Sequence, residues 1–155
     1  MRNLLLLLAL ALPPFAFAVD TGGFSAAPAR PSVQERLAKA RQAIAAQEWD
    51  AAMRELNVAV REAPRNADVH NLMGYTYRKR PNPDMAKAYE QYETALKLDP
   101  NHRGAREYLG EAYLQDKRLN DAEVQLVALE RICGGRTCEE YEDLARSIAD
   151  YKAKN

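Results

Sequence analysis

The chain is short of the residues from which most catalytic and metal sites are built. It has two cysteines, two histidines and one tryptophan among 155 residues. The histidines, His70 and His102, stand far apart from each other and from Cys133 and Cys138, so no metal-ligand spacing occurs. An HExxH motif, a CxxC pair, a glycine-rich phosphate loop and a GxSxG elbow are also missing. We therefore predict no enzymatic activity, no metal and no cofactor.

An excess of charge of either sign is missing too. Lysine and arginine together number 22, and so do aspartate and glutamate. A neutral chain in which no basic run exceeds three residues has no electrostatic means of attracting nucleic acid or an anionic membrane surface. Long hydrophobic runs are confined to the first 18 residues, so we expect no membrane span in the remainder.

The exception at the start, MRNLLLLLALALPPFAFA, has the features of a secretory signal peptide (1–18). Arg2 precedes an apolar run that is too short to cross a bilayer, and small residues stand at Ala16 and Ala18. Cleavage after Ala18 would deliver the protein to the periplasm or outside the cell. That compartment is oxidising and favours a disulfide over free thiols.

Residues 19–31 are rich in glycine, alanine and proline and show no periodicity, which predicts a flexible tether. Helical structure should begin at Ser32, because Ser32 and Glu35 have the spacing of a capping box. We expect the same kind of helix start at Asn82-Pro83-Asp84 and at Asn120 with Glu123.

Three segments of similar pattern then follow one another, at 32–66, 67–102 and 103–136. The first two close on Pro64 and Pro100, and the third has Gly134 at the matching place. Each segment carries small residues where two helices would approach closely, followed by larger apolar ones. These positions are Ala40, Ala43, Ala52, Leu56 and Ala59; Met73-Gly74, Tyr77, Ala88, Tyr92 and Ala95; and Leu109-Gly110, Tyr113, Ala122, Leu126 and Leu129.

This pattern resembles the tetratricopeptide repeat (TPR), a helix–turn–helix unit with small and aromatic residues at fixed places and a closing proline. The resemblance implies an all-α fold, a right-handed α-solenoid of three TPR-like repeats. A C-terminal capping helix is expected at 137–155, because Tyr141, Leu144, Ile148 and Tyr151 form one apolar stripe there. Thr137 and Glu140 have the spacing of a capping box at its start.

The resemblance also implies a function: TPR proteins commonly bind a peptide in a concave groove lined by the first helices. In this register the groove residues are Leu37, Arg41, Asn71, Tyr75, Arg78, Glu107, Glu111 and Leu114. Leu37 and Leu114 could instead pack under the chain termini, and the basic run at Arg78 could simply stabilise a helix end. The Lys/Asn/Arg carboxylate clamp of cytosolic TPR adaptors is absent: its places hold Leu37, Arg41, Leu72, Gly104 and Tyr108.

The histidines are expected to have structural roles, with His70 packed inside and His102 solvated in a turn. Two hypotheses remain for function. The first is an adaptor for a protein or peptide partner in the periplasm, with envelope assembly or maturation as its expected setting, and able to self-associate. The second makes Cys133 and Cys138 a thiol–disulfide redox site, since a thiol at a helix start has a lowered pKa. We favour a structural disulfide, which would fix the capping helix to the last repeat.

Overall fold

Seven α-helices follow one another along residues 31–155, which form one compact unit. The computed structural model describes residues 30–155, so the predicted signal peptide and most of the predicted tether lie outside the described residues. None of the described helices is long and apolar enough to cross a membrane. The helices are α1 (Val33–Ala45), α2 (Trp49–Glu62), α3 (Ala67–Lys79), α4 (Met85–Leu98), α5 (Arg103–Gln115), α6 (Leu119–Cys133) and α7 (Glu139–Lys154).

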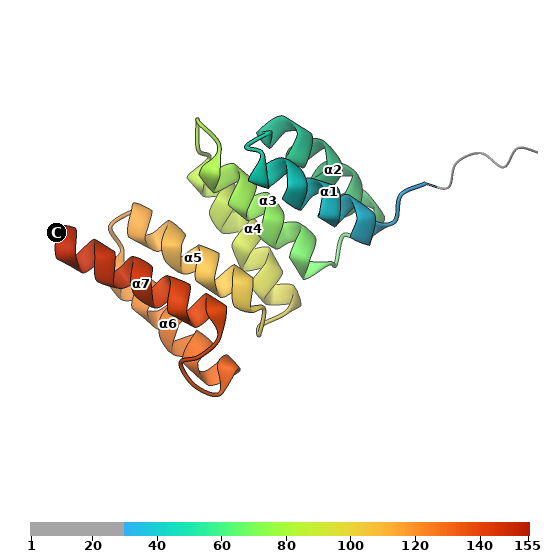
Figure 1. Ribbon diagram of the computed structural model, residues 1–155. Coiled ribbons are helices and arrows are strands. Elements are labelled where there is room, and N and C mark those ends of the chain that lie inside the picture. Colours follow the sequence, from blue (N-terminus) through green and yellow to red (C-terminus); the bar gives the residue numbers. More distant parts are fainter. Residues whose placement is uncertain (1–29) are drawn as a thin grey trace, which may run out of the picture. The chain divides into compact units, whose positions relative to one another are not determined.

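The helices stack as successive pairs, as the predicted solenoid requires (Figure 1). α1 packs on α2, α3 on α4 and α5 on α6. The first helix of each pair also contacts the first helix of the next pair, and the second helix packs against that same neighbour. α7 contacts both α5 and α6, so it takes the place of the first helix of a fourth pair. The all-α solenoid predicted from the repeats is confirmed.

The core consists of three hydrophobic clusters that tyrosines join. Tyr92 is fully buried in the middle cluster. Tyr77 packs against both the first and the middle cluster, and Tyr113 against both the middle and the last. A large ring between two pairs removes much apolar area from water and leaves its hydroxyl near an edge. These three rings therefore connect the pairs, as their positions in the repeat predict.

Two glycines permit close contacts of different kinds. A Cβ added at Gly74 would lie 2.7 Å from the ring of Tyr92 on the paired helix α4. A Cβ added at Gly110 would lie 2.6 Å from a methyl group of Leu144 on α7. Gly74 thus brings paired helices together, as predicted. Gly110 instead makes room for the capping helix, which differs from the prediction that it serves its own pair.

The sequence predicts the presence of the helices better than the residues that cap their N-termini. The Ser32 amide donates to Glu35 Oε2 at 2.7 Å and Ser32 Oγ accepts from the Glu35 amide at 3.3 Å, so the first capping box is confirmed. α4 is capped by Asp84 rather than Asn82, and α6 has no side-chain cap. α7 begins after its N-cap Cys138, one residue later than predicted, so the Thr137–Glu140 box is out of register and wrong. The Glu140 carboxylate instead lies 3.5 Å from Arg103.

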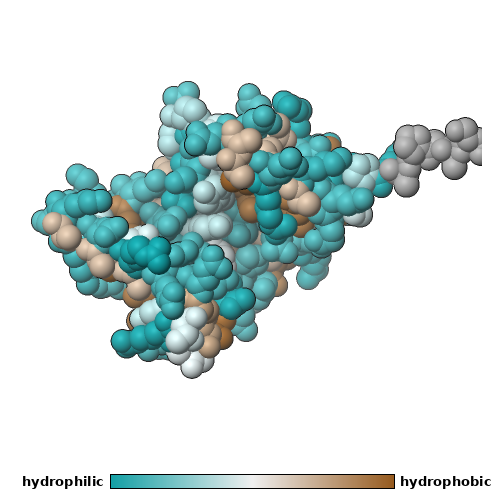
Figure 2. Space-filling model, viewed as in Figure 1, coloured by the Kyte–Doolittle hydropathy of each residue, from teal (hydrophilic) through white to brown (hydrophobic). Residues whose placement is uncertain are grey.

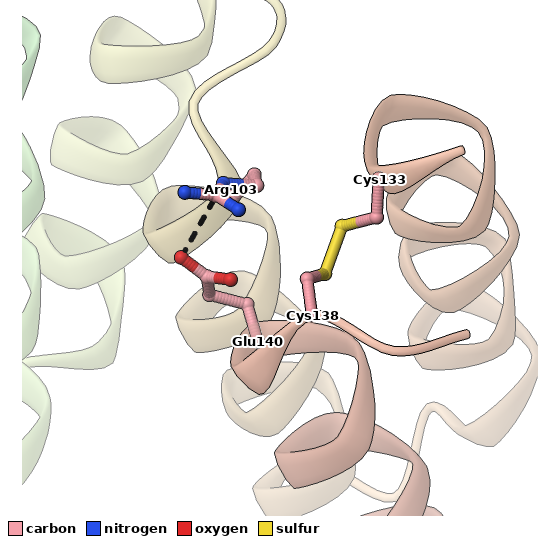
Figure 3. The surroundings of a disulfide bond; sticks show 4 residues. All are labelled: Arg103, Cys133, Cys138 and Glu140. Carbon is pink, nitrogen blue, oxygen red and sulfur yellow. Dashed lines mark ion pairs between the residues drawn. A yellow bond between two sulfur atoms is a disulfide. The ribbon is translucent and has the colours of Figure 1, made fainter. Parts of the chain in front are cut away.

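The turn between α6 and α7 carries the two cysteines (Figure 3). Gly134 ends α6 in the left-handed conformation, with φ 67°, which glycine adopts without steric cost. Cys133 is the last residue of α6, Cys138 is the N-cap of α7, and a disulfide joins them across a Cα–Cα distance of 6.0 Å. The bond therefore fixes the start of the capping helix to the end of the last pair.

Reduction of this disulfide should loosen α7 before any other helix. The bond closes a six-residue loop, for which the chain-entropy model gives about 2 kcal/mol of stabilisation. Limited proteolysis with and without a reductant checks this, and first cuts in α1 or α2 would contradict it. A reduction potential below about −300 mV would mark the bond as structural, whereas a higher one would favour the redox hypothesis.

Candidate protein-binding face

The first helices of the pairs form one face of the solenoid, and α7 continues it (Figure 1). A pocket of about 300 Å³ opens on this face. Three first helices line it: Arg41, Ile44 and Ala45 from α1, Leu72 and Tyr75 from α3, and Tyr108 from α5. In Figure 2 the middle of this face is paler than the hydrophilic surface around it. We call this surface the concave face.

Two tyrosines form the floor of the concave face between α3 and α5. The ring centroids of Tyr75 and Tyr108 lie 4.8 Å apart with their planes tilted by 54°. Tyr108 also lies 6.5 Å from the buried ring of Tyr92, which anchors it to the core. Burial raises the pKa of the Tyr75 hydroxyl, and burial together with Glu107 raises the pKa of Tyr108 to about 12. Both rings are therefore neutral, amphipathic contact surfaces at ordinary pH.

Arg78 lies beneath this floor and is only 3% exposed. Its Nε donates a hydrogen bond to Tyr92 Oη at 3.2 Å, and an Nη donates to Glu111 Oε2 at 2.6 Å. Its guanidinium carbon lies 5.5 Å from the Tyr75 ring centroid and 5.9 Å from that of Tyr108. Arg78 thus links α3 to α4 and α5, and it orients the face from below rather than meeting a partner directly.

Glu107 is the unusual residue of the concave face. It is 8% exposed, and its carboxylate forms no hydrogen bond or ion pair with any described residue. Burial raises its pKa to about 8, and the nearby carboxylates of Glu111, Asp143 and Glu140 act in the same direction. Arg78 opposes this effect without cancelling it. The side chain therefore bears a proton over much of the neutral range.

The structure gathers five of the eight predicted groove residues in one place: Asn71, Tyr75, Arg78, Glu107 and Glu111 lie on facing sides of α3 and α5. Arg41 is exposed at the α1 edge, with its guanidinium 3.9 Å from Asp68. The groove assignment is wrong for Leu37, and for Leu114 the alternative of packing under the C-terminal helix is confirmed. Leu37 is fully buried in the first cluster, and Leu114 lies in the last cluster together with residues of α7.

Sequence reasoning omitted Ile44 and Ala45 from the groove and named Leu72 and Tyr108 only as places of the absent clamp. A signal for a shared role of these two was available, because Leu72 and Tyr108 occupy equivalent repeat positions directly before Met73-Gly74 and Leu109-Gly110. The acidic residues of α7 that influence Glu107 were also missed. Their contribution depends on α7 packing beside α5, which the repeat pattern does not describe.

The two histidines have structural roles, one of them different from the prediction. His70 is buried and its ring nitrogens lie 2.8 Å from Gln91 Oε1 and 2.9 Å from the Pro64 carbonyl, so the packing prediction holds. His102 is not simply solvated: it caps α5, with Nδ1 accepting from the Ala105 amide at 3.1 Å. The other ring nitrogen of His102, Nε2, lies 3.3 Å from Asp68 Oδ1.

Paired helices of this length, stacked through small residues and tyrosines, define a tetratricopeptide repeat fold. Solved TPR domains agree. The structure of the "TPR2B-domain:pHsp70-complex of yeast Sti1" matches with a TM-score of 0.68 at 14% identity, over 79% of this chain and 98% of that one. The structure of the Sgt2 TPR domain from Aspergillus fumigatus also matches with a TM-score of 0.68, at 21% identity, over 81% of this chain and 80% of that one. No family model and no curated protein matches the sequence.

Replacing Glu107 with glutamine should flatten the dependence of stability on pH. The folded pKa is about 8 against an ordinary 4.5, so the protonated form is favoured by folding. The associated stabilisation is complete below about pH 4.5 and is lost as the pH rises through about 8. Glutamine is neutral throughout, so Glu107→Gln should be more stable than the wild type at about pH 9 and should differ less at about pH 5.

Thermal unfolding across this range tests the prediction. Glu90→Gln is the matched control, because Glu90 is exposed on α4, on the other side of the pair. In the control, the melting temperature should depend on pH as it does in the wild type. If Glu107→Gln also kept the wild-type dependence of melting temperature on pH, Glu107 would titrate normally.

Proposed function

We propose that this protein is a non-catalytic adaptor that holds a protein or peptide segment against its concave face. The observation that carries the proposal is the pocket lined by the first helices of all three pairs, with Tyr75 and Tyr108 on its floor. Rigid aromatic rings around an apolar pocket give contact area at a small cost in conformational entropy. The yeast neighbour was solved in complex with pHsp70, which favours a protein or peptide partner here as well.

The chemistry of the face argues against the partners of the cytosolic clamp. Of the five clamp positions, Leu37 is buried in the core, and Leu72, Gly104 and Tyr108 carry no charge. Arg41 alone is basic, and it lies at the rim beside Asp68. One exposed cation does not form a carboxylate site. We propose that the partner belongs instead to the periplasm, in envelope assembly or maturation.

Affinity capture with matched baits tests the adaptor function. The wild-type protein and Val124→Ala should retain the same protein from an extract of the producing cells, because Val124 is 62% exposed on α6, away from the pocket lining. Tyr75→Ala should retain at least about tenfold less, as expected when an aromatic anchor is removed from an interface. Equal retention by all three baits would move the binding site elsewhere. Charge reversal at Arg78 is unsuitable, because that buried cation stabilises the fold.

Export itself has a direct test. The signal-peptide prediction places the mature N-terminus at Val19. N-terminal sequencing of the protein recovered from an osmotic-shock fraction should therefore begin Val-Asp-Thr. A chain that retains Met1 and stays with the spheroplasts would contradict the periplasmic part of the proposal and leave the binding face untouched.

A further inference from the structure

One carboxyl group on the concave face lacks the partner that its neighbours have. Glu111 pairs with Arg78 at 2.6 Å, Glu140 with Arg103 at 3.5 Å and Asp143 with Arg146 at 3.0 Å. Glu107 lies among them, is 8% exposed and forms no ion pair or hydrogen bond with the described residues. Each of the other three carboxylates is therefore paired with a cation, and Glu107 is not.

An unpaired buried carboxyl has an energetic cost that a protein normally avoids. Buried polar groups are almost always hydrogen-bonded, and buried charges are paired, because desolvation is not otherwise compensated. Asn71 repeats the pattern on the facing helix: it is 6% exposed and its Oδ1 has no hydrogen-bond partner. The unsatisfied Asn71 Oδ1 on α3 and the Glu107 carboxyl on α5, which has no counter-ion, together favour a group, absent from the free protein, that donates hydrogen bonds or carries positive charge.

The surroundings favour a cation on an apolar stem. Tyr75 and Tyr108 flank the region, and the faces of tyrosine rings attract cations. Ile44 and Leu72 line the adjoining pocket, where the methylene stem of a long basic side chain would be covered. Arg78 already stacks near both rings from below, which shows that this aromatic pair tolerates a guanidinium.

We propose that the concave face selects a partner segment carrying a lysine or arginine, whose cation pairs with Glu107 beside Tyr75 and Tyr108. The inference rests on the proposed function, since it presupposes that a peptide segment binds on this face. It specifies the chemistry of that segment: basic and flanked by apolar residues, the opposite of an acidic terminus held by a basic clamp.

Pairing would exchange the proton of Glu107 for the partner's cation. The groups that face Glu107 are Tyr75 and Arg78 on α3, Tyr108 and Glu111 on α5, and Glu140 and Asp143 on α7. Among these only Arg78 is a cation, and it is bonded to Glu111. Binding should therefore release a proton below about pH 8, and affinity should increase as the pH rises toward that value.

The test is selection from a displayed library of random peptides against three immobilised full-length baits: wild type, Glu107→Gln and the control Glu90→Gln. We expect the wild type and the control to enrich peptides with lysine or arginine beside apolar residues. Glu107→Gln should lose the basic preference. An enriched peptide should bind about 10- to 100-fold more weakly when its basic residue is replaced by glutamine, as expected for a charge-assisted hydrogen bond.

Calorimetry with the enriched peptide separates specific pairing from general attraction. Titrations in two buffers of different ionisation enthalpy should reveal proton release with the wild type and the control, and none with Glu107→Gln. Peptides enriched without a basic residue, or a basic preference that survives in Glu107→Gln, would overturn the inference and leave the adaptor function standing. Failure of the wild type to enrich any peptide would overturn both.

Discussion

Replacing Tyr92 with alanine should lower the free energy of unfolding by about 3–5 kcal/mol, the usual range for removal of a buried aromatic side chain. Tyr92 is fully buried in the middle pair, in contact range of Gly74 and 6.5 Å from Tyr108. The buried Arg78 would also lose the hydroxyl to which its Nε donates. Denaturant unfolding monitored by circular dichroism measures the loss.

Two further variants separate the contribution of the ring from that of the hydroxyl group and provide a control. Tyr92→Phe keeps the ring and removes only the acceptor of a charged donor, so it should cost about 1.5–3 kcal/mol. Val124→Ala changes an exposed residue of α6 and should stay within about 0.5 kcal/mol of the wild type. A Tyr92→Ala variant as stable as Val124→Ala would show that the middle cluster does not depend on this ring.

The repeat could be predicted from sequence because its physical requirement is local and periodic. Close helix pairing requires small residues at recurring places, and Ala52, Ala88 and Ala122 are all fully buried. Helix starts are harder to predict, since several side chains compete for each one. Asp84 caps α4 in preference to Asn82, and α7 starts at the N-cap Cys138 rather than at Thr137.

The candidate site was predictable only in outline. Helical periodicity places Leu37 and Arg41 one turn apart on the same side of α1, yet Leu37 is in the core and Arg41 is exposed. A small rotation of the helix about its axis decides which of the two residues faces the core. The periodicity of 3.6 residues per turn does not predict so small a rotation. Which carboxylate pairs with which cation is even harder to predict from sequence. Arg78 and Glu111 are 33 residues apart, so no sequence rule reveals that Glu107 is the carboxyl left without a partner.

Replacing Leu144 with alanine should destabilise the C-terminal end of the solenoid while sparing its start. Leu144 is fully buried in the last cluster with Leu114, Leu129 and Ile148, so the expected cost is about 2–5 kcal/mol. Repeats stabilise one another mainly through their nearest neighbours. Hydrogen exchange should therefore lose protection in α5, α6 and α7 and keep it in α1 and α2. Val127→Ala, 47% exposed on α6, should change neither end.

A second substitution at the same contact tests whether the loss arises from this particular packing. Gly110→Ala alone places a Cβ 2.6 Å from a methyl group of Leu144 and should destabilise by about 1–3 kcal/mol, reduced by the better helix propensity of alanine. In the Leu144→Ala background that methyl group is gone, so Gly110→Ala should become stabilising by up to about 1 kcal/mol. The change of sign requires direct contact between the two residues. Additive effects would mean that α7 is seated elsewhere on α5.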